Sequence, residues 1–491
     1  MRLYPIITEQ VFFHFDSARD WLWVRDIVMS KKPPLVGPWS SLVGVFYGPF
    51  TYYLLVPLFV LFQGDPIGGS VYALLVQLVA LTGLYVWIRK NWGFIPATIS
   101  LFLLLVSPLT ANIATFIFQS NPSFGLGVLW LWVLSLLGKR KDVGVVLAMM
   151  TLGLGVHTNL LFTLFLLPFL GVLLLIKKWR FSRSLFFWSS SGLFLPLLPQ
   201  IVFELRHGFI QTQSLWSFVV GYNTSLGVSL NVWERLLDRG FIVLMIMNEF
   251  LTPFPHWATV LLLTGISLSG YFFWRKGIHP TQKWVIGVIC LSIAWFLLIS
   301  LTFNGQLKLW YMYWMLPMLA ALLGWWWDMI LRRGRLHAVL TILVIVGIGI
   351  VHIDHVTSGF RSHKQDTKLL RQQKRAVEQV MAMGSKETYA AYVYTEPVYD
   401  YPYQYLFWWQ WQKNGKGPVA YGYLPDKYDY VLNKKRYDPD FEPVKIVYLI
   451  MEKDNPSSDY RWETWLKAFY EFTPTERFVL PSGITIEKRV R

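Results

Sequence analysis

The chain has 491 residues, of which 54% are hydrophobic and only 15% are charged, and its mean hydropathy is +0.40. A soluble protein carries roughly 25% charged residues, so this composition excludes a large soluble protein and indicates a polytopic membrane protein. The formal charge of +16 is divided between membrane connectors and a polar tail, so we expect no nucleic-acid partner, and the single Cys290 excludes an intrachain disulfide.

The first polar feature of the chain is "FHFDSARDWLWVRDIV", residues 13–28. Asp16 is a strong N-cap residue in front of an amphipathic pattern that predicts a helix lying along the membrane surface. One interpretation is a capped surface helix with snorkelling arginines. The other is a carboxylate at the membrane edge, supported by Arg19 and Asp20 and able to accept a proton from a hydroxyl. The residues alone leave both interpretations open.

The next stretch, residues 43–62, is apolar but is interrupted by Gly48, Pro49 and Pro57. We therefore expect interfacial or re-entrant helices in the first outer loop, residues 1–70, and spans only over residues 71–352. No apolar span or signal peptide precedes this loop, so we expect that a first transmembrane helix is missing from the chain.

Ten later apolar runs are long enough, or nearly so, to cross a membrane. Basic residues gather at every second connection between them, and the positive-inside rule places those connections in the cytoplasm. On this topology 10 of the 12 acidic residues before residue 360 face outward, which indicates an outward-facing polar chamber. The runs are 71–88, 94–118, 123–138, 143–156, 160–176, 184–203, 257–274, 284–303, 309–331 and 336–352.

Two outer edges carry candidate phosphate ligands. "FELRHGF" places Arg206 between Glu204 and His207, and "NGQLKLWYMYW" contains Lys308 and Tyr311. A guanidinium or ammonium group at the interface can bind phosphate oxygens. The alternative is that these side chains are interfacial anchors.

Two further polar residues lie at short outer turns. Asn121 is in "QSNP" and His157 is in "GVHTN". Such residues often cap helices or form turns, and they can also contact substrate in an outer chamber.

Residues 361–491 have an ordinary soluble composition and predict a small α/β domain on the outer face. The aromatic stretch 399–411 has no clear period, and we expect it on the membrane or on a sugar acceptor. The predicted elements are a helix over 364–383, strands over 388–395, 445–451 and 477–489, and a helix over 459–472.

The sequence contains no P-loop, no GxGxxG after a strand and no HExxH. An enzyme with an outward site has no access to cytosolic nucleotides, so its donor must already reside in the membrane.

The order "FHFDSARD" followed by "FYGPFTYYLLVPLFVLFQGDP" resembles the first outer loop of membrane glycosyltransferases of the GT-C fold. These form the protein mannosyltransferase and aminoarabinose transferase superfamily, which is glycosyltransferase family 39-like, and the resemblance is to a bacterial subgroup. "FELRHGF", "QSNP", "HTN" and "YVYTEPVYDYPYQYLFWW" extend it over most of the chain.

The resemblance implies a mainly α, polytopic membrane protein of the bacterial cytoplasmic membrane, with an extracytoplasmic site and C-terminal domain. It implies transfer of a sugar from a polyprenyl-phosphate donor to a lipid, glycan or protein acceptor, with Asp16 as the catalytic residue. Relatives often have a Lys-Pro-Pro run that helps hold phosphate, whereas this segment reads "FYGPFTYY". That role therefore moves to Arg206, Lys308 and Tyr311. An acidic site is also compatible with a divalent metal.

Two other functions fit a polytopic chain. A transporter or flippase for lipid-linked sugars predicts internal repeats and ionisable groups deep in the spans. The sequence shows no obvious repeat, and most charges lie at span edges. A structural membrane anchor would not explain the outward bias of the carboxylates.

Overall fold

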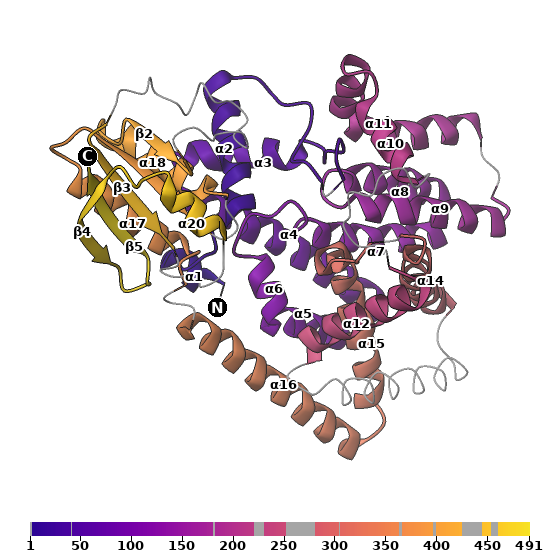
Figure 1. Cartoon of the computed structure of the whole chain (residues 1–491). Coiled ribbons are helices and arrows are strands. Elements are labelled where there is room, and N and C mark those ends of the chain that lie inside the picture. The colour runs from indigo at the N-terminus through magenta and orange to yellow at the C-terminus, as the bar shows by residue number, and fades with distance from the viewer. Residues whose placement is uncertain are drawn as a thin grey trace.

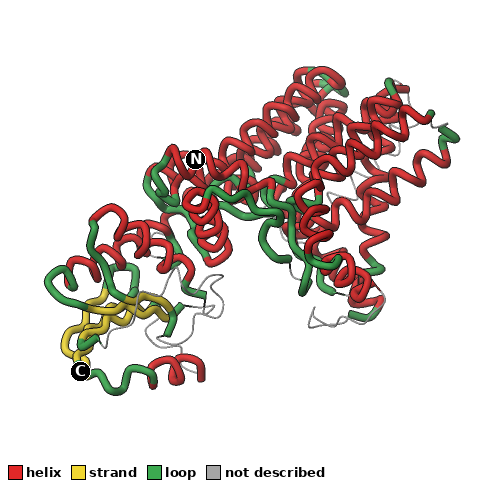
Figure 2. The backbone as a smooth tube through the Cα atoms, turned by 90° about the horizontal axis from the view of Figure 1, so that it is seen from above, coloured by secondary structure: helices red, strands yellow, loops and turns green. Residues whose placement is uncertain are grey.

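The computed structural model describes residues 2–40, 42–179, 182–219, 230–251, 280–303, 305–362, 366–395, 399–424, 444–452 and 460–491. These residues form a large helical part and a five-stranded sheet close to the C-terminus (Figure 1). The sheet lies at one end of the molecule, beside the N-terminal helices and away from most of the helical bundle (Figure 2). The prediction of a mainly α protein with a small C-terminal α/β part is confirmed.

The chain starts with three helices, α1 (Leu3–Ile7), α2 (Phe15–Ser30) and α3 (Phe50–Leu61). The helix expected after "FHFD" is confirmed, but it is not a surface helix. Arg19 and Arg25 are buried, because α2 packs between α3 and the C-terminal helix α18. With about 1.5 Å of rise per residue, α3 is too short to cross a membrane by itself.

The helical part continues to residue 362. Among the described residues, five helical segments are long and apolar enough to cross a membrane: α4, α10, most of α14, the continuous segment of η1 and α15, and α16. The predicted run 257–274 lies outside the described residues. The elements are α4 (Ile67–Trp92), α5 (Phe94–Val106), α6 (Pro108–Ile113), α7 (Ser123–Lys139), α8 (Lys141–Gly155), α9 (Leu160–Ile176), α10 (Arg183–Arg206), α11 (Ile210–Val219), α12 (Val232–Leu251), α14 (Pro280–Ser300), the 3-10 helix η1 (Leu309–Met315), α15 (Leu316–Leu331) and α16 (Arg335–Ser362).

Two helical predictions were wrong in detail. The run 94–118 is not one span, because α5 ends at Val106 and Pro108 starts the short helix α6. Proline is tolerated in the first turn of a helix but not in its interior. The predicted runs leave residues 204–256 without a helix, whereas α11 and α12 lie there. Charged residues along α12 interrupt its apolar run in the sequence.

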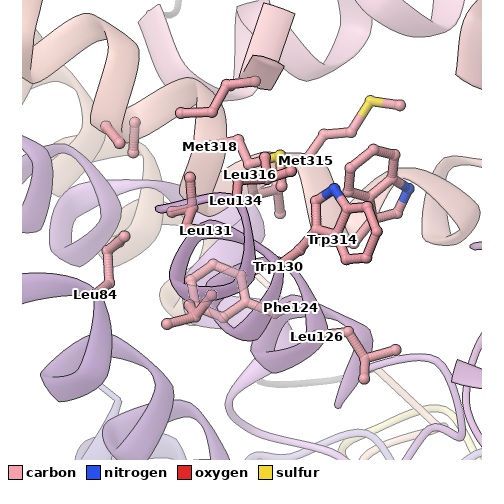
Figure 3. Packing of buried hydrophobic residues seen from close by; sticks show 14 of the residues in the cluster. Leu84, Phe124, Leu126, Trp130, Leu131, Leu134, Trp314, Met315, Leu316 and Met318 are labelled. Atoms are coloured by element: carbon pink, nitrogen blue, oxygen red, sulfur yellow. The ribbon is translucent and has the colours of Figure 1, made fainter. Parts of the chain in front are cut away.

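The core of the helical part is built on aromatic rings from α7, α9 and η1. Figure 3 shows Trp130 of α7 and Trp314 of η1 in this cluster. The ring of Phe162 lies edge-to-face with Trp130 at 5.8 Å and with Trp314 at 5.3 Å between centroids. A Cβ atom at Gly127 would lie 1.9 Å from the carbonyl oxygen of Trp314, so α7 and η1 approach each other closely. This packing fixes the position of η1, which contributes to the site described below.

The C-terminal sheet has the strand order β2-β1-β3-β5-β4. β1 pairs in parallel with β2 and β3, while β5 pairs antiparallel with β3 and β4. The strands predicted over 388–395 and 445–451 are confirmed as β1 and β3. The elements are α17 (Leu370–Met383), β1 (Tyr389–Tyr394), α18 (Tyr401–Asn414), β2 (Ala420–Gly422), β3 (Ile446–Met451), α20 (Tyr460–Lys467), β4 (Thr473–Val479) and β5 (Thr485–Val490).

One expectation for this region was wrong. The single strand predicted over 477–489 is a hairpin, in which β4 and β5 are joined by a turn containing Gly483 at φ +86°. A positive φ is accessible to glycine without a steric cost. Most of the aromatic stretch 399–411, which has no clear period in the sequence, forms the largely buried helix α18.

Alternate residues of the central strands face two different layers, as the two-residue period of a strand requires. Tyr392 and Leu449 pack toward Trp465 near α20. Ala391 and Ile450 face the opposite layer, which also contains side chains of α17, α18, α2 and α3. The predicted boundary at residues 360–361 falls in the last turn of α16, and this second hydrophobic cluster contains side chains from both sides of it.

Polar contacts reinforce this layer at the turn between α3 and α4. The carbonyl oxygen of Gly64 accepts a hydrogen bond from Trp21 Nε1 at 3.0 Å and another from the hydroxyl of Tyr405. Trp409 Nε1 donates to the carbonyl oxygen of Gln63 at 3.1 Å. Side chains of α2 and α18 therefore hold the same turn.

Candidate functional site

A cavity of about 550 Å³ lies where five segments of the chain meet. These segments are the start of α2, the connection between α2 and α3, the connection between α6 and α7, η1, and the start of α18. The lining residues are mostly aromatic: His14, Phe15, Asp16, Arg19, Trp39, Ser40, Tyr47, Phe116, Phe118, Gln119, Trp310, Tyr311, Tyr313, Tyr399 and Tyr401.

Asp16 lies in the first turn of α2 and is not its N-cap, so that prediction was wrong. The helix begins one residue earlier, at Phe15, and its N-cap is His14, whose Nδ1 accepts a hydrogen bond from the backbone N–H of Asp16 at 3.1 Å. Burial lowers the pKa of His14 to about 4, and this hydrogen bond requires Nδ1 to be unprotonated. The neutral ring therefore carries its proton on Nε2. Because His14 caps the helix, the carboxylate of Asp16 is available to the cavity.

Arg19 connects two carboxylates. Its Nη1 lies 2.7 Å from Oδ1 of Asp16, and its Nη2 lies 2.9 Å from Oδ1 of Asp20. Burial alone would lower the pKa of Arg19, but the two carboxylates outweigh this effect and raise it. The guanidinium is therefore a permanent charge that fixes the orientation of Asp16.

Asp20 lies behind Arg19, and its side chain is fully buried. The hydroxyl of Tyr52 donates to Oδ1 of Asp20 at 3.1 Å. Burial raises the pKa of Asp20 to about 6, although Arg19 opposes this shift. The side chain of Asp16 retains about 20% exposure, so of these two carboxylates it is the one that faces the cavity.

A chain of ring contacts surrounds Asp16. Tyr399 packs against Phe15 at 5.5 Å between centroids, and His14 packs against Phe116 at 5.3 Å. The chain continues through Phe118 to Trp310 and Tyr311 in η1. Tyr399 and Tyr311 therefore lie at opposite ends of these contacts, with Phe15, the neighbour of Asp16, in between.

The η1 end of the cavity is held by buried polar contacts. Asn159 Nδ2 donates to the carbonyl oxygen of Tyr311 at 3.0 Å, and its Oδ1 caps α9. The carboxylate of Asp238 accepts from the backbone N–H of Leu307 at 3.0 Å. The phenol of Tyr311 shares a hydrogen bond with Tyr47, and burial followed by this neighbour raises the pKa of Tyr47 well above its ordinary value.

The structure brings some of the predicted site residues together and places others elsewhere. Asp16, Arg19 and Tyr311 line the cavity, and Asp20 supports Arg19. Arg206 and Lys308 are exposed and are not among the lining residues. Lys308 Nζ donates to Gln306 at 3.2 Å.

The other four candidates make local contacts outside the cavity lining. Glu204 accepts hydrogen bonds from the backbone N–H groups of Gln211 and Thr212 in the first turn of α11. His207 stacks on Phe203 with a centroid distance of 4.1 Å.

His157 and Asn121 are both buried and bind backbone groups. The Nε2 atom of His157 lies 3.0 Å from the carbonyl oxygen of Pro196, and its Nδ1 accepts from the backbone N–H of Phe50 at 3.4 Å. The Nδ2 atom of Asn121 donates to the carbonyl oxygens of Ile113 and Phe116. His157 therefore joins α3 to α10, and Asn121 shapes the loop that carries Phe116 and Phe118.

The sequence analysis missed several lining residues. Tyr47 and Trp39 belong to a segment that was interpreted only as interfacial. Tyr399 precedes α18 and Tyr401 begins it, and the sequence of this helix has no apolar period. A Lys-Pro-Pro run was also overlooked, since the chain reads "KKPP" at 31–34, and its Lys32 is exposed in the segment that carries Trp39 and Tyr47. Repeated aromatic residues beside an acidic helix start were the available signal.

Within the described ranges, no group of three or more His, Cys, Asp or Glu side chains could hold a metal ion.

Comparison with models of known protein families gave no match, and neither did comparison with curated protein sequences. The solved structures that share the fold include two of ArnT. ArnT from Cupriavidus metallidurans bound to undecaprenyl phosphate has 14% sequence identity and a TM-score of 0.60, over 99% of this chain and 96% of that chain. ArnT from the same organism in the apo state has 13% identity and a TM-score of 0.58, over 97% and 94%. The expected GT-C fold is thereby confirmed.

Proposed function

We propose that this chain, which has the fold of ArnT, is an integral-membrane glycosyltransferase that moves a sugar from a polyprenyl-phosphate donor to an acceptor at the outer face of a bacterial cytoplasmic membrane. The observation that carries the proposal is Asp16, a partly exposed carboxylate fixed by Arg19 in an aromatic cavity. The structure of ArnT bound to undecaprenyl phosphate, which shares this fold, supports the choice of a polyprenyl-phosphate donor.

The reaction is a single displacement. A hydroxyl or amine of the acceptor transfers its proton to Asp16 and attacks the anomeric carbon of the donor. The bond between that carbon and the phosphate oxygen breaks, polyprenyl phosphate leaves with the electron pair, and the anomeric centre is inverted. Arg19 holds the Asp16 carboxylate in position, which reduces the ordering needed to reach the transition state.

The donor phosphate needs hydrogen-bond donors or cations because negative charge develops on it as it leaves. Tyr311 reaches the cavity from η1 and is the first candidate. Arg206 and Lys308 remain proposals for the mouth of the site, together with Lys32 of the overlooked Lys-Pro-Pro run. Each of these three cations is exposed and would need to bind the phosphate outside the cavity lining.

The test uses membranes that contain the full chain and a radiolabelled pool of polyprenyl-phosphate sugars. Asp16→Asn keeps the size of the side chain but removes the proton acceptor, so we expect transfer to fall by about 10²- to 10⁴-fold. Asp26→Asn is the matched control, because Asp26 lies on the same helix, pairs with Arg25 at 2.7 Å, and does not line the cavity.

The control variant should retain transfer close to that of the wild type. Equal transfer by wild type and Asp16→Asn would remove Asp16 from the mechanism. Absence of transfer by the wild type from every member of a donor pool varied in sugar and lipid would contradict the proposed function itself.

A further inference from the structure

Two tyrosines of the C-terminal region are stacked on each other in the wall of the cavity, so the pair presents the outer side of Tyr399 as an aromatic surface. The rings of Tyr399 and Tyr401 lie 6.0 Å apart between centroids and are inclined by only 6°. Tyr401 is 4% exposed, whereas Tyr399 is 41% exposed. One ring is therefore fixed in the protein, and its parallel neighbour remains accessible.

The chemistry of the cavity favours an uncharged ligand at this surface. Asp16 and Arg19 are the charged lining residues, and they already form an ion pair. Burial keeps His14 neutral at physiological pH, and the remaining lining side chains are aromatic, hydroxyl or amide groups. An anionic ligand at Tyr399 would find no uncommitted cation among the lining residues, whereas the donor phosphate is proposed to reach Tyr311 with exposed cations at the mouth of the site.

A pyranose ring matches such a surface. The C–H bonds on one of its faces carry partial positive charge and pack on the negative face of an aromatic ring. Its hydroxyl groups point outward and can hydrogen-bond to polar groups elsewhere in the wall. A ring stacked on Tyr399 would lie next to Phe15, which contacts Tyr399 at 5.5 Å and immediately precedes Asp16 in the chain.

Tyr399 and Tyr311 belong to different segments of the cavity wall, Tyr399 just before α18 and Tyr311 in η1. Tyr399 and Tyr311 are at opposite ends of the chain of ring contacts around Asp16. If the donor phosphate binds near Tyr311, the Tyr399 end is the one left for the acceptor. Attack from the face opposite the leaving group requires the two substrates to lie on different sides of the reacting carbon.

The surface is held rigidly. The hydroxyl of Tyr403, in the first turn of α18, donates to Glu452 at 3.1 Å, and Tyr405 reaches the carbonyl oxygen of Gly64 in the turn between α3 and α4. Rigid aromatic groups lose little entropy when a ligand binds. These contacts fix the start of α18 relative to the end of β3 and to the turn between α3 and α4.

We propose that Tyr399 and Tyr401 are a carbohydrate-stacking surface that holds the acceptor, so the nucleophile is a sugar hydroxyl of a glycan or glycolipid. The role of Asp16 in this scheme rests on the proposed function, but the binding of a sugar at Tyr399 does not. The C-terminal region thereby provides acceptor recognition for a site whose proposed proton acceptor lies in α2.

Saturation-transfer NMR on the full chain in lipid nanodiscs tests the proposal without any donor. Glycoside detergents must be absent, since their sugar head groups would occupy the surface. The probes are the methyl glycosides of glucose, galactose, mannose and N-acetylglucosamine, with cellobiose and chitobiose. We expect saturation to reach the ring C–H protons of at least one probe.

Tyr399→Ala should weaken the affinity for that probe by about tenfold. Tyr399→Phe keeps the ring and should remain within about threefold of wild type. Tyr470→Ala is the matched control, because Tyr470 is a 65% exposed tyrosine in the C-terminal region and does not line the cavity. It should bind the probe as the wild type does.

Two results would overturn the proposal: no saturation of any probe by the wild type, or equal affinity of wild type and Tyr399→Ala for the probe. Asp16→Asn separates the two proposals, because it should lower transfer by about 10²- to 10⁴-fold while the sugar probe still gives saturation transfer. Sugar binding without transfer in the wild type would contradict the proposed function but would still support the sugar-binding role of Tyr399.

Discussion

Lys374 of α17 and Asp65 of the turn between α3 and α4 are 309 positions apart in sequence, and Nζ of Lys374 lies 2.9 Å from Oδ1 of Asp65. The same ammonium lies 2.7 Å from Glu9 and over the ring of Trp409. Its side chain is 7% exposed. This cation therefore fastens the C-terminal region to two N-terminal segments, beside the helix that carries Asp16.

Lys374→Met should loosen this junction. The substitution preserves much of the aliphatic stem but leaves Asp65 and Glu9 without their cation. Loss of one partner from a fully buried pair costs about 3–5 kcal/mol, and the cost is smaller here because both carboxylates are partly exposed. Hydrogen exchange followed by mass spectrometry should show faster exchange in α17 and β1, with α7 and α9 unchanged. Lys386→Met, at an exposed position of the same region, is the control. Equal protection in both variants would show that the ion pairs do not hold the junction.

Asn159→Asp should reduce sugar transfer by more than any loss of folded protein explains. The aspartate can still accept the hydrogen bond that caps α9, but it cannot donate to the carbonyl oxygen of Tyr311 and would place two oxygens against each other. We expect η1 to shift and kcat/KM to fall by about tenfold or more. Ser182→Ala removes the cap of α10 and should leave kcat/KM unchanged. Normal transfer by Asn159→Asp would show that the position of η1 does not affect the reaction.

Asp20→Asn should alter the pH dependence of stability in a defined direction. The folded-state pKa of Asp20 is about 6 and its ordinary value is 3.8, so between these values the folded protein binds a proton that the unfolded chain does not. The wild type should therefore gain stability relative to Asp20→Asn as the pH falls from 7 to 4. Thermal midpoints of both proteins across this range provide the measurement. A difference that is independent of pH would mean that Asp20 stays ionised in the folded state.

We expect a similar pH dependence of stability from Glu452 in the C-terminal region, at higher pH. Burial raises its pKa to about 7 from an ordinary 4.5, against hydrogen bonds from Gln373 and Tyr403 that lower it. Wild-type stability should fall as the pH rises from 4.5 to 7, because the folded protein must then lose the extra proton. Glu452→Gln carries no charge, so it should be more stable than the wild type at pH 8 and similar at pH 5. If the wild type is the more stable protein at pH 8, Glu452 is stabilised as an anion.

The sequence predicted the fold class because each of its signals is local. Apolar runs such as 71–88 and 184–203 follow from the thickness of the membrane, and β1 and β3 follow from short β-branched and aromatic segments. The local rules were wrong where a single residue redirects the backbone. Pro108 divided one expected span, and Gly483 turned one expected strand into a hairpin.

The candidate site was predicted only in part, for the same physical reason. Asp16 and Arg19 are three positions apart on one helix, so their ion pair could be read from helical spacing. The other walls of the cavity come from residues near 40, 118, 311 and 400, and no local pattern places these segments together. Their meeting depends on long-range packing, including the sheet face that covers α18 and the glycine that lets η1 approach α7.

The sequence by itself determined that this is a membrane protein with a polar N-terminal helix and a small C-terminal α/β region, since composition and periodicity are properties of neighbouring residues. The tertiary structure decided that α2 is buried, that His14 and not Asp16 caps it, and that Tyr399 and Tyr401 share a cavity with Asp16. The packing of the whole chain decides which helices are buried and which distant segments lie side by side. No short stretch of sequence specifies that packing.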